Sequence, residues 1–96
     1  PSEEVAAMVG RTLVEERLAA CVNIVPRLRS IYAWRGKVED EAEVLCLVKT
    51  RPELWEALRA RIGALHPYEV PEIVALRADQ VSPPYLAWLR GETRDP

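Results

Sequence analysis

The sequence is poor in several residue types on which particular functions depend. Among 96 residues it has four glycines, one histidine, one methionine and no phenylalanine. Four glycines leave little material for a glycine-rich phosphate-binding loop, and neither such a loop nor a Ser/His/Asp constellation is present. We therefore expect a protein that is not an enzyme, has no catalytic residues and uses no organic cofactor.

The chain also lacks a block of one charge and a long apolar run. Its 13 basic and 15 acidic residues are interspersed and give a net charge of −2, so it has no basic footprint for nucleic acid. No apolar run approaches the roughly 20 residues of a membrane span, and the acidic start is unlike a signal peptide. We expect a cytoplasmic protein with no nucleic-acid or membrane partner.

The two cysteines do not form a metal motif. Cys21 and Cys46 lie in β-branched apolar runs, "ACVNIV" and "VLCLVK", and lack the spacing of metal ligands. Such runs predict two reduced, buried thiols. A disulfide and a nucleophilic pair of Cys46 with His66 are the less favoured interpretations, because an apolar strand disfavours the thiolate.

The first half of the chain predicts a helix followed by a long hairpin, within a single domain over residues 1–96. Ser2 is a good N-cap, and apolar residues at helical spacing predict a helix from there to about Leu18. Residues 21–34 read as one long strand with a bend at Pro26. The "RGK" turn and residues 38–50 complete the hairpin.

The second half predicts a helix, a stiff connection, a short strand and a last helix. Thr50 and Glu53 have the spacing of a capping box for a helix that ends near residues 63–65. The prolines in "HPYEVP" force the connection to be extended, and "EIVAL", residues 72–76, predicts a short strand. Ser82 caps a short last helix, and the tail "GETRDP" is expected to fray.

This element order predicts an α+β fold. Helices would cover one face of an antiparallel sheet, with a long β-hairpin and an extra short C-terminal helix. The order is one strand short of the ferredoxin-like βαββαβ plan. The absent first strand would be apolar and would precede Pro1, so a gap is expected in the middle of the sheet.

Several stretches together resemble the CutA family, the divalent-cation tolerance proteins. They are "ERLAACVNIVP", "SIYAWRGKVE", "LVKT", "HPYEVPEIVAL" and "YLAWL", in the family's order and spacing. The resemblance implies a ferredoxin-like subunit in a tight homotrimer, whose long hairpins pair edge to edge. It also implies copper or another divalent cation as a partner.

The hairpin tip carries residues typical of an interface. Ile31, Tyr32 and Trp34 lie where a monomer of this size could not cover them, so we predict that they lie at the trimer interface. Along the same hairpin we expect a solvated ladder of opposite charges, formed by Arg27, Arg29 and Arg35 facing Glu39, Glu41 and Glu43.

The only histidine lies in "HPYEVPEIVAL". His66, with Glu69 or Glu72 supplying oxygen, is our candidate ligand set for Cu(II) or another divalent ion. The alternative is that His66 only closes the preceding helix. The resemblance supports the metal enough to balance the two interpretations, and some relatives carry His-His before Pro-Tyr where this chain has Leu65.

A second constellation combines Lys49, Tyr68 and Trp34. The resemblance gathers these residues, with Glu69 and Glu72, around a cleft between subunits. Lys49 precedes a helix N-terminus and could anchor an anion there. The alternative is an interfacial salt bridge from Lys49 to Glu69 or Glu72, serving assembly only.

Three functions follow from these observations. The first is a homotrimeric, copper-binding protein in cation tolerance and the response to metal ions. The second is a signalling trimer like the PII proteins, binding a small anionic ligand in the inter-subunit cleft. The third is a non-catalytic scaffold whose stable trimer presents a partner surface.

Overall fold

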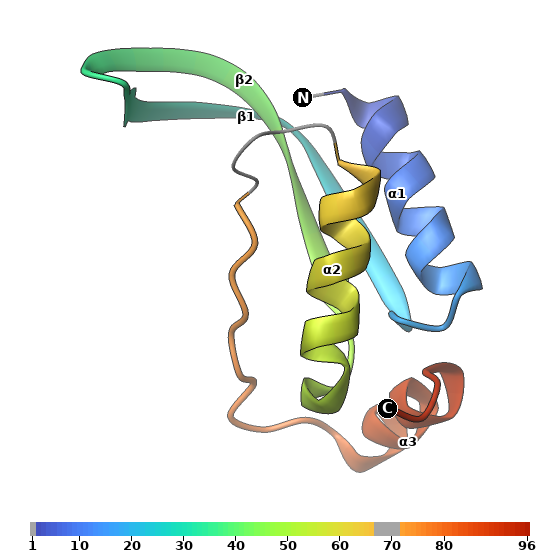
Figure 1. Ribbon diagram of the computed structural model, residues 1–96. Helices are drawn as coiled ribbons and strands as arrows, with labels where there is room; N and C mark the ends of the chain where they lie inside the picture. Colours follow the sequence, from blue (N-terminus) through green and yellow to red (C-terminus); the bar gives the residue numbers. More distant parts are fainter. Residues whose placement is uncertain (1, 67–71) are drawn as a thin grey trace.

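The computed structural model describes residues 2–66 and 72–96. In these residues the order is helix, hairpin, helix, extended segment, helix (Figure 1). The elements are α1 (Glu3–Glu15), β1 (Cys21–Trp34), β2 (Lys37–Lys49), the 3₁₀ turn η1 (Pro52–Leu54), α2 (Trp55–Leu65) and α3 (Pro83–Glu92). This is the predicted α+β class, with α1 and α2 side by side against the hairpin. No helix in the described residues is long and apolar enough to cross a membrane.

Helix α1 begins as the sequence predicts and ends earlier. The Ser2 hydroxyl accepts a hydrogen bond from the Val5 amide at 3.0 Å, and Glu3 and Glu4 lie in the first turn, where they oppose the helix dipole. The helix stops at Glu15 because Arg17 adopts a φ of 61°. The amide of Leu18 then bonds back to the Leu13 carbonyl at 2.9 Å, which buries Leu18 as a C-terminal cap contact.

Strands β1 and β2 form a two-stranded antiparallel sheet with the predicted bend. Pairing runs from Cys21 with Lys49 to Trp34 with Lys37, and the register shifts between Val25 and Leu28, where Pro26 lies. Proline lacks an amide hydrogen, so this bulge lets the strand pass it without losing a ladder bond. The outer half of the hairpin therefore swings away from the helices (Figure 1).

The turn at the hairpin tip has a conformation that its residues explain. Arg35 has a φ of 51° and Gly36 a φ of 81°. Two successive positive φ values define the type I′ turn, which matches the twist of the flanking strands. Glycine adopts such a φ without a steric penalty, so the "RG" pair sets the hairpin register.

The predicted capping box at the start of the second helix is wrong. The Thr50 hydroxyl donates to the Leu18 carbonyl at 2.6 Å, and neither η1 nor α2 has a side-chain cap. Thr50 therefore connects β2 to the end of the α1–β1 connection. The carbonyl of Leu18 is a partner 32 positions away, which local spacing could not reveal.

The core lies between the two long helices and the inner half of the hairpin. It is built from Val9, Leu13, Leu18, Ala19 and Leu58, with Val22 and Val48 of the sheet packed against it. Gly10 allows this close approach, because a Cβ there would lie 3.1 Å from a Val22 methyl.

The predicted strand over residues 72–76 does not form. Residues 72–78 run as an extended segment (Figure 1), but they are paired with no strand of the described chain. Val74 is 70% exposed and Leu76 is 91% exposed. A β-strand needs a neighbour to bond with, and neither β1 nor β2 pairs with this segment.

The C-terminal tail is docked instead of frayed. The Arg94 amide donates to the Arg17 carbonyl at 2.8 Å, and Arg51 donates to the carbonyls of Thr93 and Arg94. Thr93 is 3% exposed. Trp88 is 45% exposed and lies against Tyr85, with their ring centroids 5.4 Å apart.

Candidate functional site

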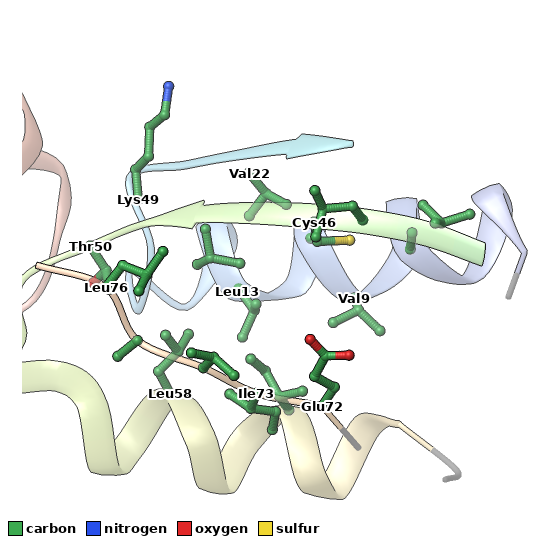
Figure 2. Close-up of a pocket in the computed structure, with 18 of the residues that line it drawn as sticks. Val9, Leu13, Val22, Cys46, Lys49, Thr50, Leu58, Glu72, Ile73 and Leu76 are labelled. Atoms are coloured by element: carbon green, nitrogen blue, oxygen red, sulfur yellow. The ribbon is translucent and has the colours of Figure 1, made fainter. Parts of the chain in front are cut away.

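The main concave feature of the described residues is a groove on the helix side of β2. Its volume is about 1970 Å³. The walls are β2, the facing sides of α1 and α2, and the extended residues 72–81 (Figure 2). Cys46 lies on β2 at the middle of the groove, while Glu72, Ile73 and Leu76 line the opposite side. The groove thus separates β2 from the extended segment that contains Glu72, Ile73 and Leu76.

His66 and Glu72 both line this groove. His66 directly follows α2, and its amide donates to the Ile62 carbonyl at 2.8 Å, so its backbone closes the helix as the second interpretation expected. Burial lowers the pKa of the His66 imidazole, because burial disfavours the charged form. The imidazole is therefore neutral at neutral pH, the form that can bind a metal.

The predicted metal ligands are brought together only in part. Glu69 lies outside the described residues, so the structure does not place it. Among residues 2–66 and 72–96, no three histidine, cysteine or acidic side chains gather closely enough to hold a metal ion. His66 and Glu72 thus share one groove without forming a complete coordination sphere.

Lys49 is the last residue of β2 and lines the groove, with its side chain pointing away from the other labelled lining residues (Figure 2). Its ammonium lies 5.9 Å from the centroid of the Tyr85 ring of α3, a cation–π distance. In the described part of the chain Lys49 forms no ion pair, so the alternative salt bridge to Glu72 is absent. Tyr68, the other predicted cleft residue, lies outside the described residues.

The predicted interface residues lie on the outer half of the hairpin, on two different faces. Ile31 is paired with Asp40, Tyr32 with Glu39 and Trp34 with Lys37. Since side chains alternate along a strand, Tyr32 and Trp34 share one face and Ile31 occupies the other. They are 38%, 39% and 66% exposed, in that order. Trp34 is one of the residues that line the groove. The Arg35 guanidinium lies 5.2 Å from the centroid of the Trp34 ring.

The charge ladder on the hairpin differs from the predicted one. Arg29 forms a two-bond ion pair with Asp40, at 2.9 and 2.7 Å, and not with Glu39, Glu41 or Glu43. Those glutamates share the face of Tyr32. Desolvation and the nearby Glu41 raise the pKa of Tyr32, so its hydroxyl stays protonated beside them.

Two residues that line the groove, Cys46 and Tyr85, were not predicted from the sequence to be part of a site. Cys46 is exposed and Cys21 is half-buried, and both are free, so the expectation of two buried thiols is wrong. Partial burial still raises the pKa of the Cys46 thiol, which argues against a nucleophile. Tyr85 was missed because its contact with Lys49 joins two elements far apart in the sequence, and no local signal marks such a pair.

Comparison with known proteins identifies the family. The family model described as "CutA1 divalent ion tolerance protein" matches residues 1–92. The divalent-cation tolerance protein CutA of Thermus thermophilus is 57% identical over 93 residues, which are 97% of this chain and 90% of that protein. Protein CutA of Mus musculus is 48% identical over 93 residues, and the chain spans 52% of its length.

The solved structures agree with the sequence comparison. The Thermus thermophilus protein superposes with a TM-score of 0.94 at 56% identity, covering 98% of this chain and 91% of that one. A "PII-like protein CutA" from Nostoc sp. PCC 7120 superposes with a TM-score of 0.89 at 41% identity, covering 96% and 89%. These likenesses confirm the ferredoxin-like α+β class and the predicted resemblance. The chain belongs to the CutA1 divalent ion tolerance family.

Proposed function

We propose that this chain is a homotrimeric, non-enzymatic protein of the cytoplasm. It would bind a divalent metal ion, preferentially copper, and would function in cation tolerance. The family describes tolerance to divalent ions. Free Cys21 and Cys46 thiols suit a reducing compartment. The raised pKa of Cys46 argues against thiol catalysis.

The observation that carries the metal proposal is the state of His66. Its imidazole lines the groove with Glu72, and burial lowers its pKa. A neutral imidazole with a carboxylate is a donor set that late divalent ions accept, Cu(II) more strongly than the others. Because the described residues supply only two of the donors needed, Glu69 or a neighbouring subunit would complete the site.

The test is a copper titration followed by calorimetry at pH 7.0. We expect saturable binding of about one ion per subunit, because the neutral His66 imidazole is the one nitrogen donor of its type in the chain. His66→Ala should abolish this binding and Glu72→Gln should weaken it. Glu56→Gln is the matched control, because Glu56 pairs with Arg59 on the exposed side of α2. Unchanged binding by His66→Ala would refute the site.

The pH dependence of binding has a defined direction. Burial holds the pKa of the His66 imidazole below its ordinary value of 6.5, so the neutral form predominates at pH 6.5. Copper binding should therefore persist through 6.5 and disappear only as the pH falls through the lowered pKa. Binding that is lost already above pH 7 would contradict this ligand assignment.

Lys49 supports a second candidate, the binding of a small anion in a cleft of the PII-like kind. Lys49 lines the groove, and its ammonium forms no ion pair within the described residues and lies near Tyr85. Such a cation is available to a phosphate or carboxylate. A thermal-shift screen of nucleotides and organic acids should find ligands that stabilise the chain but not Lys49→Met. Lys37→Met, at the hairpin tip, is the control. Equal shifts in the Lys49→Met variant, or no shift at all, would eliminate this candidate.

A further inference from the structure

Helix α3 presents two aromatic side chains to solvent. Tyr85 is 39% exposed and Trp88 is 45% exposed, and residues three apart on a helix lie on the same side. Other residues hold the helix in place: Leu89 is 7% exposed, and the Gly91 carbonyl accepts a hydrogen bond from the Arg17 guanidinium at 2.6 Å. The two rings are therefore not required to dock α3, and their exposed faces are free for contact with a ligand.

The two rings form one aromatic surface. The centroids of Tyr85 and Trp88 lie 5.4 Å apart and the ring planes are inclined by 40°, within the range of favourable aromatic pairs. Each ring restricts the other, which lowers the entropy that a ligand must remove on binding. Aromatic side chains stack with planar ligand groups, because one π-face can lie against another. This surface therefore suits a ligand with a planar ring.

A lysine without an ion pair lies beside this surface. The Lys49 ammonium is 5.9 Å from the centroid of the Tyr85 ring, near the outer limit of about 6 Å for a cation–π contact. The Lys49 side chain points away from Glu72 and the other labelled residues of the groove (Figure 2). Within the described residues it forms no ion pair, so it brings an uncompensated positive charge to the rings.

Three arginines that contact or belong to α3 and the tail differ from Lys49, because each is already engaged. Arg17 and Arg51 donate to backbone carbonyls of residues 91–94. Arg90 lies 3.6 Å from the Glu53 carboxylate. These guanidinium groups hold the helix and the tail, whereas the Lys49 ammonium can bind an anion without breaking a contact that docks α3.

We propose that Lys49, Tyr85 and Trp88 form a binding site for an aromatic phosphate, a planar ring that carries a phosphate group. The ring stacks on the two aromatic side chains, and the phosphate pairs with the Lys49 ammonium, a point charge that suits phosphate. Glu92 lies one helical turn beyond Trp88, so its carboxylate repels the phosphate and orients it toward Lys49. The proposal rests on the anion binding proposed above for Lys49 and adds the class of ligand.

Calorimetry of the 96-residue chain with three probes tests the proposal. Phenyl phosphate carries both groups, inorganic phosphate carries only the anion, and phenol carries only the ring. We expect phenyl phosphate to bind about tenfold more tightly than inorganic phosphate, because stacking on aromatic side chains contributes on that order. Phenol should bind most weakly. The Trp88 indole N–H resonance should shift with phenyl phosphate and not with inorganic phosphate, which locates the ring on the unmodified chain.

Substitutions at the three residues assign the preference to the site. Tyr85→Leu and Trp88→Leu keep an apolar side chain but remove the ring, so each should lose the preference for phenyl phosphate and retain the binding of inorganic phosphate. Tyr85→Phe keeps the ring and should keep the preference. Lys49→Met should lose the binding of both phosphates. All three positions are exposed, so these changes should leave the fold intact.

The probes separate failure of this proposal from failure of anion binding itself. Equal binding of phenyl phosphate and inorganic phosphate would leave Lys49 as an anion site and overturn the preference for an aromatic ligand. Binding of neither would remove both proposals. An unmoved Trp88 resonance, or a preference that survives either leucine variant, would place the ring elsewhere and overturn this site. Phenol that binds as tightly as phenyl phosphate would also overturn it.

Discussion

Replacing Leu13 with alanine is expected to lower the free energy of unfolding by about 3 kcal/mol, within the 2–5 kcal/mol typical of buried leucines. Leu13 is 1% exposed and belongs to the cluster that joins α1 to α2. The loss combines the transfer of the removed methyl groups with the cavity they leave. Urea denaturation followed by circular dichroism measures it, and it would be a large fraction of the 5–15 kcal/mol of a small domain.

The matched control is the same chemical change at an exposed site. Leu76 is 91% exposed in the unpaired segment, so Leu76→Ala should change the free energy of unfolding by less than about 0.5 kcal/mol. Both variants must be compared at one protomer concentration, because assembly adds to apparent stability. A loss below about 1 kcal/mol for Leu13→Ala would mean that this cluster is not the centre of the core.

Features that depend on neighbours in the sequence were predictable. The Ser2 cap, the bend at Pro26 and the Arg35–Gly36 turn each follow from the backbone preferences of one or two residues. The hydrophobic spacing of α1 similarly indicated Val9 and Leu13 as core positions. These local rules were enough to place the helices and the hairpin and, from them, to give the fold class.

Features that depend on distant partners were predicted wrongly. The Thr50 hydroxyl bonds to Leu18 across 32 positions, a contact that competes successfully with the local cap. The tail is held by Arg51 and Arg17, neither of which belongs to its own element. Residues 72–76 have the composition of a strand, but a strand forms only where another backbone supplies the bonds.

The candidate site likewise combines features that depend on the sequence alone with features that depend on tertiary packing. His66 and Glu72 were indicated by their types and spacing, and both line the groove. The environment that lowers the pKa of His66 is tertiary, as is the position of Lys49 beside Tyr85. Sequence can therefore name the groups that do the chemistry, whereas their protonation and contacts depend on packing.

Single charges at the hairpin should convert the proposed trimer into monomers. Light scattering of the unmodified chain is expected to give about 33 kDa, three times the 10.9 kDa of one subunit. Trp34→Glu and Ile31→Lys should each reduce this toward the subunit mass. Each places a charge in the proposed interface, where assembly would strip it of water, and tryptophan is among the residues that contribute most to interface affinity.

The two substitutions are chosen so that the isolated hairpin tolerates them. Glu at 34 would face Lys37, and Lys at 31 would face Asp40, so each new charge has an opposite partner in its own subunit. Met8→Glu is the control, because Met8 is a comparably exposed apolar residue on α1, at 47%. Because Trp34 and Ile31 lie on opposite faces, dissociation by both variants requires that the interface covers both faces, as edge-to-edge pairing of hairpins would. Dissociation by one variant alone would restrict the interface to that face. A mass near 11 kDa for the unmodified chain, or a trimer that survives both substitutions, would show that the hairpin tip does not hold the subunits together.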